Sequence, residues 1–218
     1  MPDNTRRQDD SGGAESNPVF DTRAREALIL GKPPRIAPLN PSELGKEASE
    51  TAAALRRAAS ATPSDEVTEF SATMLRHPDL YRRHVELAFQ LYGGKLSPRD
   101  RELVILRIGW LCKAPYEWGE HVKIGKRVGL TPEEIERATC GSTAPGWGED
   151  DRAMVRAAEE LLQDAMISDE TWEVLSRRLD EQQLIELPLL VGQYLGLAYL
   201  QNALRLRLIP GNPGLSAR

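Results

Sequence analysis

Two short motifs that start helices constrain the fold of this chain most. Ser97-Pro98-Arg99-Asp100 places serine at an N-cap, proline at the first helical position and an acidic residue three positions after the cap. Thr131-Pro132-Glu133-Glu134 repeats this arrangement and adds the glutamate of a capping box. Gly93-Gly94, Gly129 and Gly141 close stretches of helical length. No segment alternates apolar and polar residues as strands do, so the sequence predicts an all-α fold.

We expect a bundle of six to eight helices. These six to eight helices are expected from nine candidate segments, 42–59, 64–76, 79–92, 98–112, 115–128, 132–141, 150–164, 168–179 and 181–208. The segment 98–112 is apolar around most of its circumference, which predicts a buried central helix. The last segment contains Pro188, which predicts a kink because proline removes one helical hydrogen bond.

The chain of 218 residues is long enough for one domain with an extended arm. Residues 1–41 are expected to form that arm, disordered at first and then extended. The first 22 or so are rich in Asp, Gly, Ser and Asn, and 32–41 contain four prolines. One helical domain is expected at 42–210, followed by a tail at 211–218.

Composition excludes several classes of protein. The net charge is -5 and no basic cluster is present, so nucleic-acid binding is not expected. The longest apolar stretch, Leu184–Leu200, is interrupted by Glu186 and Pro188, which argues against a membrane span. The N-terminus has no apolar run typical of a secretory signal, and Cys112 and Cys140 are isolated thiols. We therefore expect a soluble, cytoplasmic protein.

Three side chains form a candidate acid/base site. Glu117 and His121 are four residues apart, which places them on one helix face. Glu102 lies in the preceding apolar helix, where an ionised carboxylate is costly unless it is paired. If the two helices pair, the three groups converge on one cavity and form a proton-transfer site. The alternative is a solvated surface pair of Glu117 and His121.

The central sequence resembles a known family. The stretches Leu96–Arg107, Tyr116–His121 and Gly129-Leu130-Thr131 are similar to those of the carboxymuconolactone decarboxylase family and the related alkylhydroperoxidase D-like (AhpD-like) proteins. The resemblance covers roughly residues 70 to 208. It implies an AhpD-like helical bundle whose subunits assemble into trimers or hexamers.

The resemblance also indicates which branch of the family this chain is similar to. Disulfide-reducing members carry a CxxC pair, a histidine four residues after the second cysteine, and an upstream glutamate. When His121 is placed on that histidine, Ala114 and Glu117 occupy the cysteine positions and Glu102 matches the glutamate. Cys112 falls two residues too early to replace the first thiol. Thiol peroxidase or disulfide reductase chemistry is therefore disfavoured, and the decarboxylase-like branch is favoured.

The expected function is a cofactor-independent acid/base enzyme: a decarboxylase, isomerase or hydrolase acting on a small lactone or unsaturated carboxylic acid. His121 or Glu117 would move a proton next to a conjugated carbonyl, and Glu102 would tune the imidazole. The residues expected to shape the substrate pocket are Tyr116, Trp118, His84 and Tyr194. The alternative is a non-catalytic family member that binds a ligand or serves as an oligomeric scaffold. A homo-oligomer is expected in either case, because the helices carry more apolar surface than one subunit buries.

A metal centre is not expected. Glu117, Glu120 and His121 are residue types that ligate metals in helical bundles. However, neither a Glu-x-x-His pair nor an HExxH motif occurs in the chain.

Overall fold

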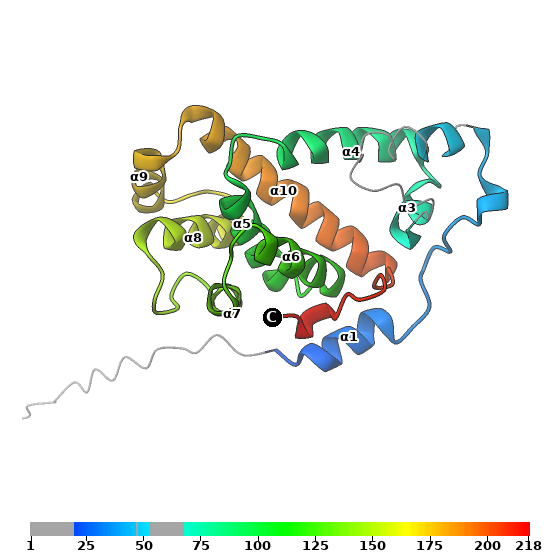
Figure 1. The fold of residues 1–218 in the computed structure, drawn as a ribbon, viewed down its shortest axis with the longest axis horizontal. Coiled ribbons are helices and arrows are strands. Elements are labelled where there is room, and N and C mark those ends of the chain that lie inside the picture. Colours follow the sequence, from blue (N-terminus) through cyan, green and yellow to red (C-terminus); the bar gives the residue numbers. More distant parts are fainter. Residues whose placement is uncertain (1–19, 47, 53–67) are drawn as a thin grey trace, which may run out of the picture.

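The computed structural model describes residues 20–46, 48–52 and 68–218 (Figure 1). Within these ranges there are helices and no strand, which confirms the all-α prediction. Nine α-helices have bounds there, more than the six to eight expected, partly because α1 forms inside the predicted arm. The elements are α1 (Thr22–Leu30), η1 (Pro41–Glu43), α3 (Glu69–Met74), α4 (Pro78–Tyr92), α5 (Pro98–Leu111), α6 (Pro115–Arg127), α7 (Pro132–Cys140), α8 (Glu149–Asp164), α9 (Asp169–Arg178), α10 (Glu181–Leu204) and η2 (Gly214–Ser216).

The two helix-start motifs act as the sequence predicts. Ser97 Oγ accepts a hydrogen bond from the backbone N–H of Asp100 at 3.1 Å, and α5 begins at the following proline. Thr131 Oγ1 accepts from the N–H of Glu134 at 3.2 Å, while a carboxylate oxygen of Glu134 accepts from the N–H of Thr131 at 2.8 Å. Both caps satisfy donors that a helix start leaves unpaired.

Two expected helices extend beyond the described residues. The segment 42–59 is helical at residues 46 and 48–52, and its remainder from 53 lies outside the description. The expected start of the next helix at Ser64 lies there too, while α3 begins at Glu69 with Thr68 as its N-cap. The last helix is continuous through Pro188 and ends at Leu204, four residues earlier than expected. It ends there because the next residue adopts the left-handed conformation (φ 58°).

The N-terminal arm is not extended throughout. Asp21 Oδ1 accepts a hydrogen bond from the backbone N–H of Ala24 at 3.0 Å and starts α1. This helix packs against η2 near the end of the chain. The proline-rich stretch that follows is tied to the helical body, because the N–H groups of Arg35 and Leu39 donate to the carbonyls of Leu204 and Ala72.

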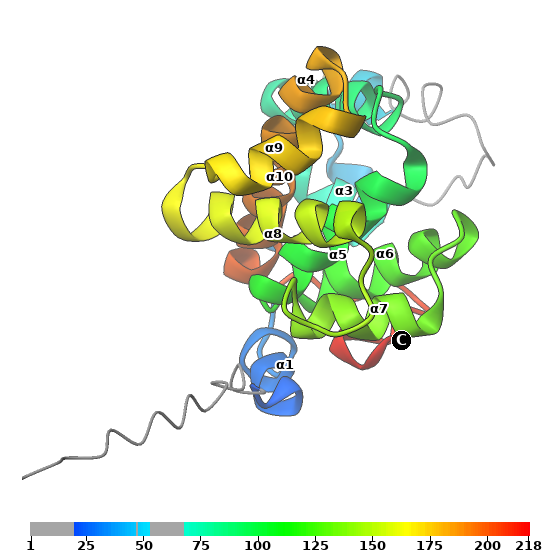
Figure 2. The same cartoon turned by 90° about the vertical axis from the view of Figure 1, so that its left-hand side faces the viewer.

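Helix α5 is the centre of the core. It contacts α6, α7, α8 and α10, which surround it in two perpendicular views (Figures 1 and 2). Ten consecutive residues, 100–109, are buried, including both apolar and charged side chains. The prediction of a buried central helix is therefore confirmed.

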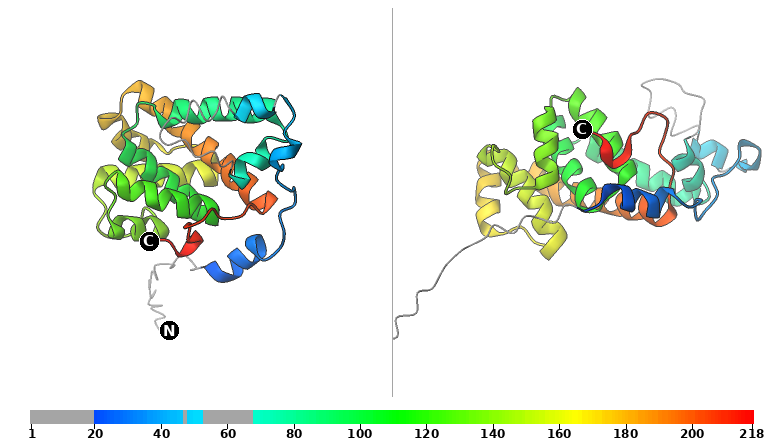
Figure 3. Two further views of the ribbon diagram at one scale, coloured as in Figure 1. Left: turned by 45° about the vertical axis from the view of Figure 1, so that its right-hand side comes forward. Right: turned by 90° about the horizontal axis from the view of Figure 1, so that it is seen from below.

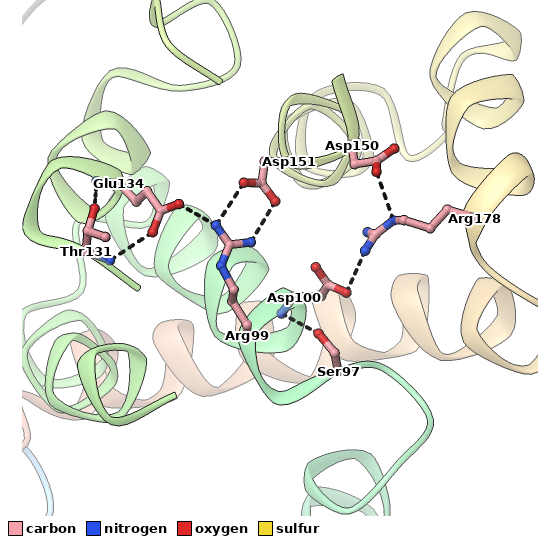
Figure 4. Close-up of polar contacts among 8 residues, drawn as sticks. All are labelled: Ser97, Arg99, Asp100, Thr131, Glu134, Asp150, Asp151 and Arg178. Atoms are coloured by element: carbon pink, nitrogen blue, oxygen red, sulfur yellow. Dashed lines mark hydrogen bonds and ion pairs between the residues drawn. The ribbon is translucent and has the colours of Figure 1, made fainter. Parts of the chain in front are cut away.

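Ion pairs hold the start of α5 against three other helices (Figure 4). Arg99 lies between Asp151 on α8 (2.8 Å) and Glu134 on α7 (2.5 Å). The neighbouring Asp100 accepts from Arg178 on α9 at 2.9 Å. These contacts involve partly buried groups, so water screens them less than ordinary surface pairs. They fix the register of α5 just before Glu102.

The tail at 211–218 packs into the fold. Leu215 has no exposed surface, and its backbone N–H donates to Glu26 Oε1 on α1 at 2.7 Å. The indole N–H of Trp118 donates to the carbonyl oxygen of Ala217 at 3.0 Å. Figure 3 shows this last segment next to α1 and α6. The tail therefore forms one side of the packing around α6.

Helix α10 has an inner and an outer side. Its length and composition would allow it to cross a membrane, and 28% of its apolar window is buried, but one such helix is weak evidence for a span. Its inner side packs into the core, whereas Ile185, Leu189 and Tyr199 are exposed. The described structure thus gives no strong evidence for a membrane span.

Candidate active site

The three acid/base residues meet in the interior of the molecule. Glu102 comes from α5, and Glu117 and His121 come from α6. His121 Nδ1 lies 2.6 Å from Glu102 Oε2, and its Nε2 lies 3.1 Å from Glu117 Oε1. The exposed fractions are 0%, 3% and 8% for Glu102, Glu117 and His121, so the alternative of a solvated surface pair is wrong.

A close backbone contact fixes α6 at this point. Gly119 lies between Glu117 and His121, and a Cβ added to it would fall 1.8 Å from Asn212 Oδ1. The Asn212 side chain donates to the carbonyl of Tyr116 at 3.0 Å. The packed C-terminal tail therefore sets the position of the turn that carries the two ionisable side chains.

Two further side chains complete the buried network. Arg101, which is 4% exposed, places Nε 3.2 Å from Glu102 Oε1. Gln201 on α10 donates from Nε2 to Glu117 Oε2 at 2.6 Å. When His121 is protonated, two cations face two carboxylates, and the buried group has no net charge. This balance reduces the large cost of burying each charge alone.

The imidazole of His121 is held in its protonated form. Burial alone would lower its pKa, but the hydrogen bonds and charges of Glu102 and Glu117 outweigh burial and raise the pKa to about 10. The ring also packs edge-on against Tyr194, with centroids 5.0 Å apart. Because both ring nitrogens are bonded to carboxylates, His121 has a fixed orientation and carries a proton on each nitrogen.

A pocket of about 210 Å³ opens onto this network. It lies between α3, α4, α6 and α10, and its lining is mainly apolar. Glu117 and His121 lie in its wall, whereas Glu102 does not and supports the imidazole from behind. The lining residues are Phe70, His84, Val85, Ala88, Tyr116, Glu117, Glu120, His121, Tyr194, Leu197 and Gln201.

Three of the four expected pocket residues line this pocket. Burial raises the pKa values of Tyr116 and Tyr194, and nearby glutamates add to the effect, so both phenols stay protonated. Burial lowers the pKa of His84, against a smaller opposing effect of Glu117, so this imidazole is uncharged at neutral pH. The placement of Trp118 in the pocket is wrong, because its side chain is fully buried in the core.

Three residues of the site carried no prediction from the sequence: Gln201, Arg101 and Phe70. Gln201 follows Tyr194 by seven residues, which is two helical turns, so the spacing places both on one face of α10. A polar residue on the apolar face of a helix was the available signal. No comparable signal marks Phe70, whose place in the pocket depends on how α3 packs.

The described residues place no thiol in the lining of this pocket. Among the described residues, no group of three or more His, Cys, Asp and Glu side chains is arranged to hold a metal ion. Cys112 and Cys140 are free thiols outside the pocket lining. Burial and the charge of Glu117 raise the pKa of the Cys112 thiol to about 11, which keeps it in the unreactive protonated form.

Comparisons with solved structures agree on the fold. A peroxidase-related protein with an AhpD core from Ralstonia eutropha JMP134 aligns with a TM-score of 0.67 at 14% identity, over 82% of this chain and 94% of that one. A peroxidase-related protein from Silicibacter sp. TM1040 gives 0.64 at 15% identity, over 83% and 96%. The debrominase Bmp8 in complex with 2,3,4-tribromopyrrole gives 0.62 at 16% identity, over 81% and 92%. At these identities the likeness establishes an AhpD-like helical fold.

The sequence comparison identifies the part of the chain that carries the site. No curated protein matches the sequence. Residues 78–160 match the model of the carboxymuconolactone decarboxylase family, and this stretch includes α5 and α6 with Glu102, Glu117 and His121. Through this segment the chain is similar to the carboxymuconolactone decarboxylase family, and its fold is AhpD-like.

Proposed function

We propose that this protein is a cofactor-independent acid/base enzyme that acts on a small lactone or related unsaturated compound. The observation that carries the proposal is the buried chain of Glu102, His121 and Glu117, which ends at a pocket of about 210 Å³. An imidazole between two carboxylates can pass protons without exposing a charge to water. The reaction class would be that of a decarboxylase, isomerase or hydrolase.

In this proposal Glu117 transfers the proton. Both nitrogens of His121 are bonded to carboxylates, whereas Glu117 lines the pocket and each of its oxygens keeps a second lone pair. The Glu117 carboxylate would remove a proton from carbon next to a conjugated carbonyl and return it at another position. His121 would stabilise the ionised carboxylate by donating from Nε2, and Glu102 would hold the imidazole in place.

The pocket also limits the size and shape of the substrate. Phe70 and Tyr116 stand with ring centroids 6.2 Å apart and form an aromatic wall. Such walls favour flat, conjugated molecules. The like-folded debrominase is in complex with a small planar ring, 2,3,4-tribromopyrrole, which is consistent with a compact pocket in this fold.

The proposal is tested by deuterium exchange in D₂O, followed by NMR for a panel of unsaturated lactones and muconate-like acids. We expect the protein to accelerate exchange at carbon for at least one compound. Glu117→Gln and His121→Gln should each reduce that rate by about a hundredfold to ten-thousandfold, which is the usual contribution of a positioned acid or base. Glu173→Gln on α9 removes an exposed carboxylate far from the pocket and should keep the full rate. Exchange no faster than in buffer, or full rates in both site variants, would refute the proposal.

We also propose that the protein is a cytoplasmic homo-oligomer, a trimer or hexamer as its resemblance to the carboxymuconolactone decarboxylase family implies. Exposed Leu80 and Leu87 on α4, with Ile185, Leu189 and Tyr199 on α10, provide apolar surface that a second subunit can cover. This observation is also what favours the alternative of an oligomeric scaffold. Sedimentation at micromolar concentration should detect an assembly, and a monomer alone would contradict it.

A further inference from the structure

We infer that the pocket selects uncharged, planar ligands and rejects the carboxylate anions of the same shape. This inference rests on the proposed function only in using the same pocket. It narrows the substrate class to uncharged lactones, enols or amides, and it narrows the reaction class to isomerase or hydrolase, because a decarboxylase must bind a carboxylate. It is based on how the charged groups around the pocket are paired with one another.

The cations next to the pocket are already paired. His121 is bonded to Glu102 and Glu117, and Arg101 behind it is bonded to Glu102. Glu120, which lines the pocket, has its Oε1 2.8 Å from Lys123 Nζ. Among the lining residues, all of which are described, none is lysine or arginine. A carboxylate that entered would lose its hydration without gaining a cation of its own, which is costly.

The amide of Gln201 supplies no cation to the pocket either. Gln201 is 4% exposed, lines the pocket and donates from Nε2 to the carboxylate of Glu117. A carboxylate anion placed beside Glu117 would therefore meet an uncharged amide and a group of like charge, which disfavours the anion.

The other polar groups in the lining suit an uncharged ligand as well. Tyr116 and Tyr194 remain protonated phenols, and His84 remains an uncharged imidazole. Each can exchange neutral hydrogen bonds with a carbonyl or hydroxyl group. Apolar side chains from α3, α4 and α10 cover the remaining surface.

The test compares 2-furamide with 2-furoate, which have nearly the same shape and differ by one charge at neutral pH. Binding is measured by calorimetry, and the ring signals of His121 report by NMR whether the probe occupies this pocket. We expect furamide to bind at least about tenfold more tightly than furoate, since burying an unpaired charge costs more than 1.4 kcal/mol, the equivalent of tenfold.

A variant of one lining carboxylate provides a second test. Glu120→Gln removes a negative charge from the pocket lining and leaves Lys123 without its paired carboxylate. It should raise the affinity for furoate about threefold to tenfold, with little change for furamide. The matched control is Glu173→Gln, which removes the carboxylate of an i,i+4 pair with Arg177 on α9 and should change neither affinity.

Three outcomes would overturn the inference: equal or tighter binding of furoate, an unchanged furoate affinity in Glu120→Gln, or no shift of the His121 signals by either probe at tens of millimolar. The proposed function fails separately, because it is judged by exchange at carbon. Rapid exchange with a preference for carboxylate anions would leave the function standing and refute only the selectivity.

Discussion

Raising the pH from 7 to 8.5 should destabilise the folded protein through the titration of His121. Its pKa is raised from 6.5 to about 10 in the fold, against the effect of burial, by Glu102 and Glu117. The folded state therefore keeps a proton that the unfolded chain has released. The stabilisation is fully present below pH 6.5 and is lost as the pH rises through the folded pKa near 10.

The size of the effect follows from proton linkage. One proton bound only in the folded state lowers the free energy of unfolding by about 1.4 kcal/mol per pH unit. From pH 7 to 8.5 the expected loss is about 2 kcal/mol. Other shifted groups act outside this window. The lowered pKa of His84 changes the free energy of unfolding below pH 6.5, and the raised pKa of Cys112 changes it above pH 9.

The assay is urea denaturation at half-unit steps of pH, for the wild type and for His121→Gln. Glutamine keeps an amide donor in the cluster but does not titrate, so the variant should show a nearly flat free energy of unfolding between pH 7 and 8.5. The difference between the two proteins isolates the histidine. A flat wild-type profile, or an equal slope in the variant, would refute the reasoning. NMR titration of the His121 ring gives a check that does not depend on unfolding.

The remaining predictions concern the carboxylate bonded to His121 and the packing of the helix that carries this residue. Glu102→Gln removes one of the two carboxylates bonded to His121 and should lower its pKa by at least about one unit, read from the ring signals; an unchanged pKa would show that Glu102 does not tune it. Gly119→Ala places a methyl group against Asn212 and should destabilise the protein by about 1–3 kcal/mol in urea. Gly192→Ala, which meets no atom within 4 Å, is the helical control and should be neutral or stabilising.

The core of the site was predictable because its determinants are local. The caps at Ser97 and Thr131 set where helices start, and the four-residue spacing of Glu117 and His121 places both on one face. The apolar surroundings of Glu102 indicated that it would be buried and need a partner. These relationships span one or two helical turns, which is the range over which sequence patterns determine geometry.

The rest of the site and of the fold could not be predicted, because it depends on contacts between distant parts of the chain. Gln201 reaches Glu117 across 84 positions, and the crossing of α10 over α6 cannot be read from either helix alone. Trp118 was expected in the pocket, but its side chain lies in the core, where the indole N–H donates to the carbonyl of Ala217, 99 positions away. Helix α1 was not predicted because its sequence has no strong apolar face. Its packing against η2 is a contact between the two ends of the described fold, which the local sequence does not indicate.

The packed tail has a consequence for the order of events during synthesis. The turn of α6 that carries Glu117 and His121 is held by Asn212 and by the carbonyl of Ala217. Helical segments can form as the chain leaves the ribosome, but this turn lacks its final contacts until residues 212–217 have emerged. The scaffold would then assemble first, and the ionisable pair would reach its final geometry only after residues 212–217 have emerged. A nascent chain arrested before residue 212 should be helical yet lack the ordered ring environment of His121.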